Sequence, residues 1–135
     1  MLSFVTLASG SSGNAALVSC GQTHILLDAG ISARRITTAL RGLGVDPASL
    51  SGVLITHEHT DHISGLATLT KQLGLPVYAT APTLDALAMK VPAIPEKRLG
   101  RFFAPGESFP LGELWIEPFA TSHDAACSVG YAITG

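Results

Sequence analysis

The feature that most constrains this chain is a cluster of three histidines within six residues. They belong to the run His-Glu-His-Thr-Asp-His, which follows directly on the apolar residues 52–56. In an extended chain, side chains two residues apart lie on the same face, so His57 and His59 can bind one cation together. As the chain turns from strand into helix, the adjacent Asp61 and His62 can bind a second cation close to the first.

This spacing is specific for metal binding. The pattern His-x-His-x-Asp-His occurs by chance in roughly one chain of this length in a few thousand. Histidines that only end a strand or lie on a solvated loop are the alternative, and the preceding strand argues against it. The zinc-protease motif His-Glu-x-x-His is excluded, because the residue four positions after His57 is Asp61. Glu58 and Thr60 alternate away from the ligands, so we expect them to be exposed.

Further candidates lie outside the cluster. His123 follows the apolar run 114–120, where a loop is expected to begin, and is the candidate third nitrogen ligand of the first metal. A loop histidine without a partner is the alternative. Asp28 ends an apolar run, where its carboxylate could hold the outer nitrogen of a ligating histidine or only form a turn before glycine. The Gly-Ser-rich residues 10–14 could receive a substrate oxygen on backbone N–H groups, or form only a turn.

The composition is that of one soluble domain. Of the 135 residues, 47% are hydrophobic and 13% are charged, yet no uninterrupted apolar stretch approaches the ~20 residues of a membrane span. The first residues lack the basic and apolar segments of a secretion signal, so we expect a cytoplasmic protein. The formal net charge of −2 excludes the overall positive charge typical of nucleic-acid binders and leaves local basic patches open.

Predicted strands and helices alternate along the chain, which indicates a layered α/β or α+β fold. Apolar runs between turn residues predict strands at residues 3–7, 15–20, 24–27, 52–56, 76–79, 101–103, 114–119 and 128–134. The first predicted helix is capped by Ser32, ends at Gly44 and has the apolar stripe Ile36, Leu40 and Leu43. The histidine motif opens a second helix with the stripe Leu66, Leu69 and Leu73, which ends at Gly74. A third runs from Pro82 to Lys90, and Pro92 ends it.

Taken together, these motifs resemble the metallo-β-lactamase fold superfamily of binuclear metallohydrolases. The resemblance depends on Thr56-His57-x-His59-x-Asp61-His62, with Asp28 upstream and His123 downstream. Within the superfamily, the runs Leu7–Asn14 and Pro118–Ala125 are similar to the YycJ/WalJ-type branch. The resemblance implies the N-terminal half of an αββα sandwich, with a mixed sheet flanked by helices. It also implies two divalent ions, zinc or manganese, and phosphodiester cleavage as in a DNA exonuclease.

The sequence departs from the superfamily pattern after His123. Family members supply a bridging aspartate and a final histidine from later segments. Here no histidine follows His123, and Asp124 is the only later aspartate. We therefore expect residues 1–135 to be a partial domain, from a longer protein or a truncated form, with little or no activity alone. Half a sandwich leaves an apolar sheet face uncovered, so the isolated chain is expected to dimerise or aggregate.

The leading hypothesis for the complete protein is hydrolysis by metal-activated hydroxide. Bound cations lower the pKa of water toward ~7, and two ions about 3.5–4 Å apart stabilise attack on a phosphodiester such as DNA. Asp61 is the catalytic candidate, because it would orient the nucleophile as well as bind the second ion. Hydrolysis of a thioester or a lactam is the second hypothesis, since the same nucleophile attacks carbonyl carbon. The third is a non-catalytic fragment whose metal serves folding or partner assembly.

Overall fold

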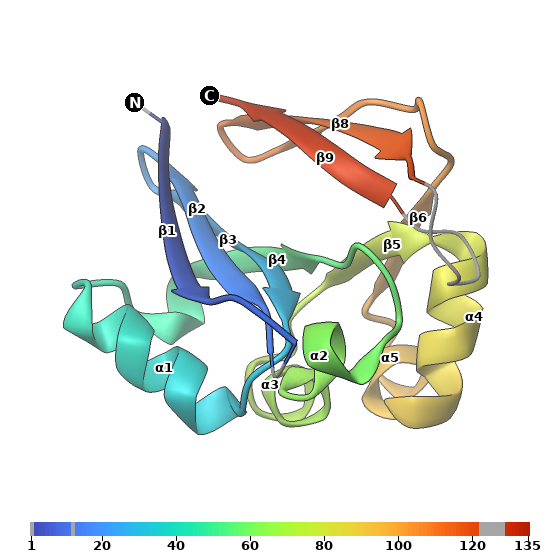
Figure 1. Cartoon of the computed structure of the whole chain (residues 1–135), viewed down its shortest axis with the longest axis horizontal. Coiled ribbons are helices and arrows are strands. Elements are labelled where there is room, and N and C mark those ends of the chain that lie inside the picture. Colours follow the sequence, from blue (N-terminus) through green and yellow to red (C-terminus); the bar gives the residue numbers. More distant parts are fainter. Residues whose placement is uncertain (1, 12, 122–128) are drawn as a thin grey trace.

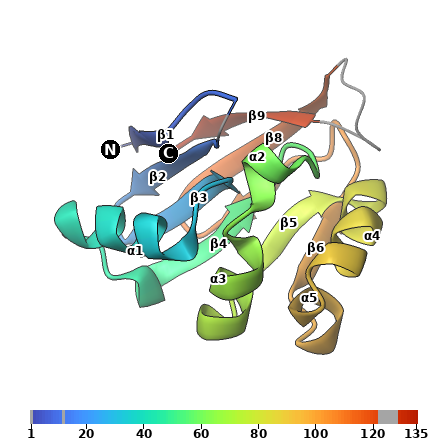
Figure 2. The ribbon, with the colours of Figure 1, turned by 60° about the horizontal axis from the view of Figure 1, so that its bottom comes forward.

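The computed structural model places a large mixed sheet between a layer of helices and a smaller second sheet (Figure 1). It describes residues 2–11, 13–121 and 129–135. The helices lie on the face of the large sheet that is opposite to the small sheet, and the rotated view shows the same arrangement (Figure 2). The predicted α/β class, with a mixed sheet flanked by helices, is therefore confirmed.

The large sheet is antiparallel at one side and parallel at the other. From edge to edge its strands are β1 (Leu2–Ala8), β2 (Ala15–Cys20), β3 (Thr23–Ala29), β4 (Leu50–Leu54), β5 (Val77–Thr80) and β6 (Gly100–Phe103). The first three strands pair antiparallel, and β4, β5 and β6 continue parallel to β3. Because β3 and β4 are parallel, their carboxyl ends lie side by side, and the segments that follow them meet there.

Helices cover one face of this sheet, and local sequence signals explain where two of them begin or end. The helices are α1 (Ala33–Gly42), α3 (Leu66–Leu73), α4 (Ala81–Lys90) and α5 (Ala93–Glu96), with the one-turn α2 (Thr60–Ile63) at the sheet edge and a 3₁₀ turn at Pro47–Ser49. The hydroxyl of Ser32 accepts a hydrogen bond from the backbone N–H of Arg35, which makes Ser32 the predicted cap of α1. Gly74 ends α3 in the left-handed conformation, with φ of 62°.

Two apolar cores result, one on each side of the large sheet. Successive strand residues face opposite sides, so Leu26 packs toward the helices and Ile25 toward the small sheet. Both residues are fully buried. The helix-side core includes Ile36, Leu40, Val53, Leu66, Leu69 and Val77, and the core between the sheets includes Val18, Leu54, Leu114 and Ile116. Burial on both faces is typical of parallel strands such as β4.

The small sheet has one buried and one exposed face. It consists of the antiparallel strands β7 (Phe109–Leu111), β8 (Leu114–Ala120) and β9 (Val129–Thr134). In β8 the alternate residues Leu114 and Ile116 face the large sheet, whereas Trp115 and Phe119 are 44% and 48% exposed. The described residues therefore include an exposed apolar surface on the small sheet. The self-association that it predicts stays a prediction.

Some local predictions were wrong, each for a physical reason. Strand β7 was not predicted, because it is only three residues long and contains Pro110, which donates no ladder hydrogen bond. Leu43, which was expected on the buried stripe of α1, is 47% exposed, because it is the C-cap beyond the last helical residue. The helix after the histidine motif is divided into α2 and α3 at Gly65, whose N–H donates to Ala29 O. In the part of the chain that is described, the helices are too short or too polar to cross a membrane.

Candidate functional site

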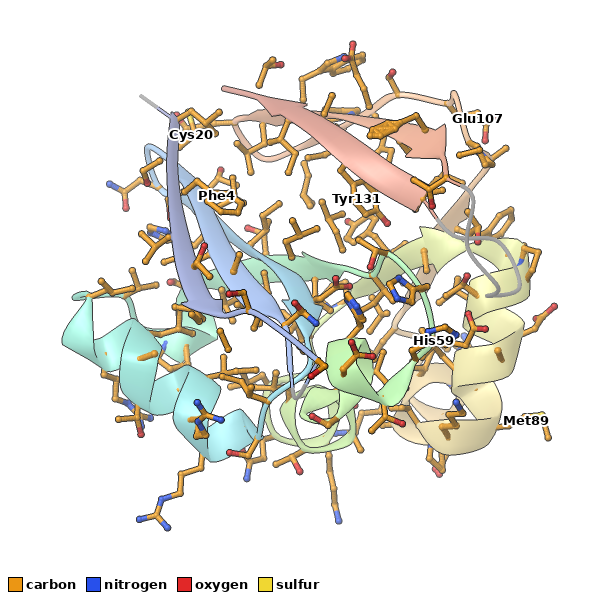
Figure 3. The ribbon with its side chains drawn as sticks, viewed as in Figure 1. Phe4, Cys20, His59, Met89, Glu107 and Tyr131 are labelled. Carbon is orange, nitrogen blue, oxygen red and sulfur yellow. The ribbon has the colours of Figure 1, made fainter. Side chains whose placement is uncertain are left out.

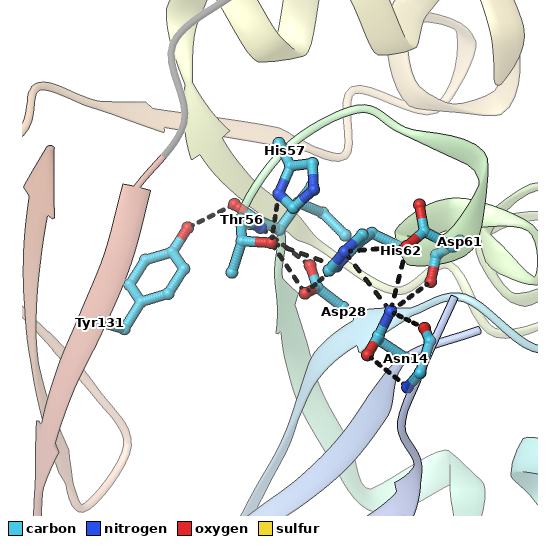
Figure 4. Close-up of polar contacts among 9 residues, drawn as sticks. Asn14, Asp28, Thr56, His57, Asp61, His62 and Tyr131 are labelled. Atoms are coloured by element: carbon cyan, nitrogen blue, oxygen red, sulfur yellow. Dashed lines mark hydrogen bonds and ion pairs between the residues drawn. The ribbon is translucent and has the colours of Figure 1, made fainter. Parts of the chain in front are cut away.

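The histidine motif lies at the end of the large sheet where the carboxyl ends of β3 and β4 meet. Asp28 connects these two strand ends. Leu27 pairs with Ala16 and Ala29 pairs with Ala15, so Asp28 is the extra residue of a β-bulge, with φ of 60°. The bulge turns its carboxylate toward Thr56, two residues after β4. The Thr56 N–H donates to Asp28 Oδ1 and the Thr56 hydroxyl to Asp28 Oδ2, both at 2.8 Å (Figure 4).

The same carboxylate holds His62. Asp28 Oδ2 lies 2.6 Å from Nδ1 of His62, and because a carboxylate only accepts, the imidazole Nδ1 carries the proton. Burial lowers the pKa of His62, but the hydrogen bond to Asp28 and the charges of Asp28 and Asp61 outweigh it and raise the pKa above its ordinary value. Nε2, the other ring nitrogen, lies 3.4 Å from Asp61 Oδ2. The contact between an aspartate and the outer nitrogen of a motif histidine is therefore present.

Thr56 determines which ring nitrogen of His57 carries the proton, by the same argument from donors and acceptors. Its hydroxyl has one hydrogen, which goes to Asp28, so it can only accept from His57 Nδ1, 2.9 Å away. The lone pair of a neutral His57 is then on Nε2. The His57 ring is buried, with its centroid 3.8 Å from that of His62 and 4.8 Å from that of His59. Asp28 and Thr56 thus place the protons of two histidines on Nδ1, which leaves the lone pair of each neutral ring on Nε2, where it can bind a metal.

The Gly-Ser-rich loop reaches the other side of the motif through Asn14. The Asn14 N–H donates to Asp61 O at 2.7 Å, and the side-chain Nδ2 lies 3.2 Å from Asp61 Oδ2. The Gly10 N–H donates to Asn14 Oδ1 at 3.2 Å. These two backbone N–H groups therefore already have acceptors within the protein, which argues against their use as an anion cradle. Ser12 lies outside the described residues.

The small sheet is joined to the large sheet beside the motif. Val129, the first residue of β9, donates from its N–H to Thr56 O at 3.0 Å. Tyr131 extends from β9 between the sheets, and its hydroxyl donates to Ile55 O at 2.7 Å (Figure 3). Burial raises the pKa of Tyr131 well above its ordinary value, and the charge of Asp28 adds to the shift. His123 lies outside the described residues.

One expectation about the loop is corrected. Glu58 was expected to be exposed, but it is partly buried, whereas Thr60 is exposed as predicted. Lys90, at the end of α4, donates to Glu58 O at 3.3 Å, so this part of the loop is held against α4. The loop between β4 and α2 lies beside α4 (Figure 1), and this tertiary contact, rather than the alternation of an extended strand, decides the exposure of Glu58.

The donor set fits a divalent metal in its chemistry. Imidazole nitrogens beside a carboxylate oxygen are ligands that zinc and manganese accept in proteins. Among residues 2–11, 13–121 and 129–135, no three His, Cys, Asp or Glu side chains already stand close enough to hold an ion. The structure brings His57, His59, Asp61 and His62 onto one loop and first turn, with Asp28 behind them.

Two residues that organise this site, Thr56 and Asn14, have no distinct signal in the sequence. Thr56 was noted only as part of the motif, although its hydroxyl connects Asp28 to His57. Asn14 was noted only as the last residue of the Gly-Ser-rich run, which was expected to receive a substrate oxygen or to form a turn, and of the run that resembles the branch. Its contact with Asp61 spans 47 positions of the sequence, and local patterns contain no signal for such a distance.

Comparison with known proteins agrees with this geometry. Residues 8–126 match the family model of the metallo-beta-lactamase superfamily. Exodeoxyribonuclease YycJ of Bacillus anthracis is 38% identical over 132 residues, which cover 97% of this chain and 49% of that protein. Exodeoxyribonuclease WalJ of Streptococcus pneumoniae is 36% identical over 132 residues, which cover 93% of this chain and 47% of that protein.

A solved structure shows the same fold. The crystal structure of the metallo-beta-lactamase SMB-1 in complex with mercaptoacetic acid superposes with a TM-score of 0.77 at 27% identity. The alignment covers 96% of this chain and 54% of that chain. The present chain thus spans about half the length of the curated relatives that it matches.

Proposed function

The chain belongs to the metallo-beta-lactamase superfamily, and we propose that its histidine loop is part of the metal site of a hydrolase that cleaves phosphodiester bonds in DNA. The membership confirms the resemblance that the motifs indicate, and the similarity to YycJ and WalJ agrees with the branch. Both relatives are named exodeoxyribonucleases, which supports DNA as the substrate class. We further propose that the complete protein acts in the cytoplasm.

The observation that carries the proposal is the set of hydrogen bonds that Asp28 makes with the histidine motif. Asp28 contacts His62 directly and His57 through the hydroxyl of Thr56. Metal-ligating histidines typically donate their outer N–H to a carboxylate or another acceptor, which fixes the tautomer and the ring orientation. His62 donates to Asp28 and His57 donates to Thr56, at 2.6 and 2.9 Å. Both histidines belong to the motif whose spacing predicts metal ligands. The chain supports Nε2 of both rings as metal ligands.

We assign the proposed ligands in two groups. His57 and His59, with His123, would bind the first ion, and Asp61 and His62 would bind the second. His123 lies outside the described residues, and its support comes from the sequence, in which it follows the apolar run 114–120. Imidazole with carboxylate ligands suits zinc or manganese.

Each described residue has a definite part in the proposed reaction. When bound, divalent metal ions acidify water and neutralise developing charge on the phosphoryl oxygens. Asp28 keeps the proton of His62 on Nδ1, and Thr56 does the same for His57. Asp61 offers a carboxylate oxygen beside His62 Nε2, where it can hold the attacking water in line with the scissile bond. The ties from Val129 and Tyr131 to the β4 end keep the small sheet against this loop.

The proposal is tested by replacing Asp61 with alanine in the full protein. Turnover of bis(p-nitrophenyl) phosphate and of end-labelled DNA should fall by more than about 100-fold. Asp85→Ala is the matched control, because Asp85 is exposed on α4 and makes no contact with the motif that the structure records. Turnover by the Asp61 variant at the level of the control would refute the assignment.

Parallel assays separate the other hypotheses. A lactam and a thioester substrate are offered to the same metal-loaded sample, and cleavage of either in place of the phosphodiester would move the function to that class. Elemental analysis gives the metal count. Two ions per chain support the hydrolase, whereas one ion in a closed four-coordinate site would support a structural role.

A further inference from the structure

Asn14 is the residue through which the Gly-Ser-rich loop contacts the histidine motif. Its side-chain nitrogen Nδ2 lies 3.2 Å from Asp61 Oδ2 and 3.5 Å from His62 Nε2 (Figure 4). The same nitrogen lies 2.9 Å from Gly10 O and 3.3 Å from Asp61 O. One carboxamide thus contacts both side chains that we propose as ligands of the second ion.

The orientation of this carboxamide follows from its partners. The Gly10 N–H donates to Asn14 Oδ1 at 3.2 Å, so the oxygen end faces Gly10. The nitrogen end faces oxygen acceptors: the carbonyls of Gly10 and Asp61 and the Asp61 carboxylate. Turning the amide over would set its oxygen against these oxygens and its N–H groups against the Gly10 N–H. The amide therefore presents a donor to Asp61.

Backbone contacts hold Asn14 in place independently of its side chain. The Asn14 N–H donates to Asp61 O at 2.7 Å, and Asn14 O accepts from the Gly30 N–H at 2.8 Å. Gly30 has no side chain to separate the strands, since a Cβ there would lie 1.8 Å from Asp61 O. The start of β2, the end of β3 and the first turn of α2 are thus joined through the main chain. A truncated side chain at position 14 would leave these contacts intact.

We infer that Asn14 is a positioning residue, which donates to Asp61 Oδ2 and so fixes the orientation of this carboxylate beside His62 Nε2, where both side chains would bind the second metal ion; this rests on the function proposed above. Carboxylates that ligate a metal are commonly held in place by a hydrogen bond from a neighbouring group. An uncharged amide supplies that bond without the repulsion that a lysine or arginine would exert on a cation. Asparagine at position 14 therefore fits a metal-bound Asp61 better than any charged donor.

The role of Asn14 in metal binding is separable from a role in folding. In the metal-free full protein, Asn14→Ala and the similarly sized Asn14→Leu remove the donor but keep both backbone contacts. Titration calorimetry with Zn²⁺ alone and with Co²⁺ alone gives the affinity of each ion. The visible absorption of bound Co²⁺ reports on the coordination of each site. Ser32→Ala is the control, because it removes a helix cap of α1 that makes no contact with the motif.

The expected result is a split between the two ions. Both Asn14 variants should bind the second ion about 10–100-fold more weakly, the range found for partners of ligating groups, with an altered Co²⁺ spectrum. The first ion should bind within about threefold of the wild type, and Ser32→Ala should change neither affinity. Wild-type affinity for both ions in the Asn14 variants would overturn the inference, and so would an equal loss at both sites that follows thermal stability. A wild-type protein that binds no divalent ion would overturn the proposed function itself.

Discussion

Replacing Asp28 with asparagine tests whether Asp28 keeps the proton of His62 on Nδ1. The substitution keeps the size of the side chain and suits the backbone, because asparagine adopts the left-handed conformation, here φ of 60°, at least as readily as aspartate. Oδ1 can still accept from the Thr56 N–H. An NH₂ group in place of Oδ2, however, faces the Thr56 hydroxyl and His62 Nδ1, which both donate in the wild type.

The size of the effect follows from these two contacts. Hydrogen bonds to a charged group contribute about 1.5–3 kcal/mol each, so losing both sets an upper limit of roughly 3–6 kcal/mol. Part of this loss is recovered, because the Thr56 hydroxyl can turn to accept and a neutral His62 can move its proton to Nε2. We therefore expect the free energy of unfolding of the metal-free protein to fall by about 1–3 kcal/mol. This partial recovery of stability requires His62 to carry its proton on Nε2, which is the nitrogen proposed to bind the metal.

Metal affinity therefore reveals more than stability does. With its proton on Nε2, His62 must change tautomer before it can ligate, so the second ion should bind about 10–100-fold more weakly, equivalent to roughly 1.4–2.7 kcal/mol. Urea denaturation of the metal-free protein measures the stability change. Long-range ¹H–¹⁵N NMR of the imidazoles identifies the tautomer of His62 directly. The argument is refuted if His62 of the variant keeps its proton on Nδ1 and binds zinc within twofold of the wild type.

Other substitutions test the surroundings of the site. Gly30→Ala should destabilise the protein by more than about 2 kcal/mol, because the new Cβ meets the backbone of Asp61, whereas Gly42→Ala in α1, with open space at its Cβ, should gain about 0.5–1 kcal/mol. Tyr131→Phe should cost about 1 kcal/mol in urea denaturation at pH 7 through the lost bond to Ile55 O. Burial raises the pKa of the folded tyrosine above the unfolded value of 10.0. The stability that neutral Tyr131 contributes is therefore fully present below pH 10 and is lost as the pH rises through the folded pKa. The phenylalanine variant should lose less stability over this alkaline range, and parallel alkaline curves would contradict the assignment. Replacing both Trp115 and Phe119 with threonine should reduce self-association of the 135-residue chain in sedimentation equilibrium, with Met89→Thr, 89% exposed on α4, as the control.

Sequence patterns predicted the elements whose signals are local. The cap at Ser32 and the left-handed glycine at 74 lie within a few residues of the helix ends that they specify. The division between α2 and α3 has a distant cause: a Cβ on Gly65 would lie 2.2 Å from Ile31 O, so the β3–α1 connection packs directly against the helix start. Such a contact appears only after the chain has folded. For this reason the helix was predicted as continuous.

The candidate site divides in the same way. The histidine spacing predicted which side chains share a loop, and that loop lies at the carboxyl end of β4 as the apolar run indicates. The parallel pairing of β3 with β4 then places Asp28 beside Thr56, although 28 positions separate them in the sequence. No local pattern contains that pairing, so the roles of Thr56 and Asn14 emerge only from the fold.

The arrangement around Thr56 explains why the site depends on both sheets. Its N–H and hydroxyl bind Asp28 of the large sheet, and its carbonyl accepts from Val129 of the small sheet. Displacing the small sheet would therefore move Thr56, whose hydroxyl keeps the proton of His57 on Nδ1. Loss of a single hydrogen bond at Thr56 O should thus weaken metal binding more than its effect on stability alone implies.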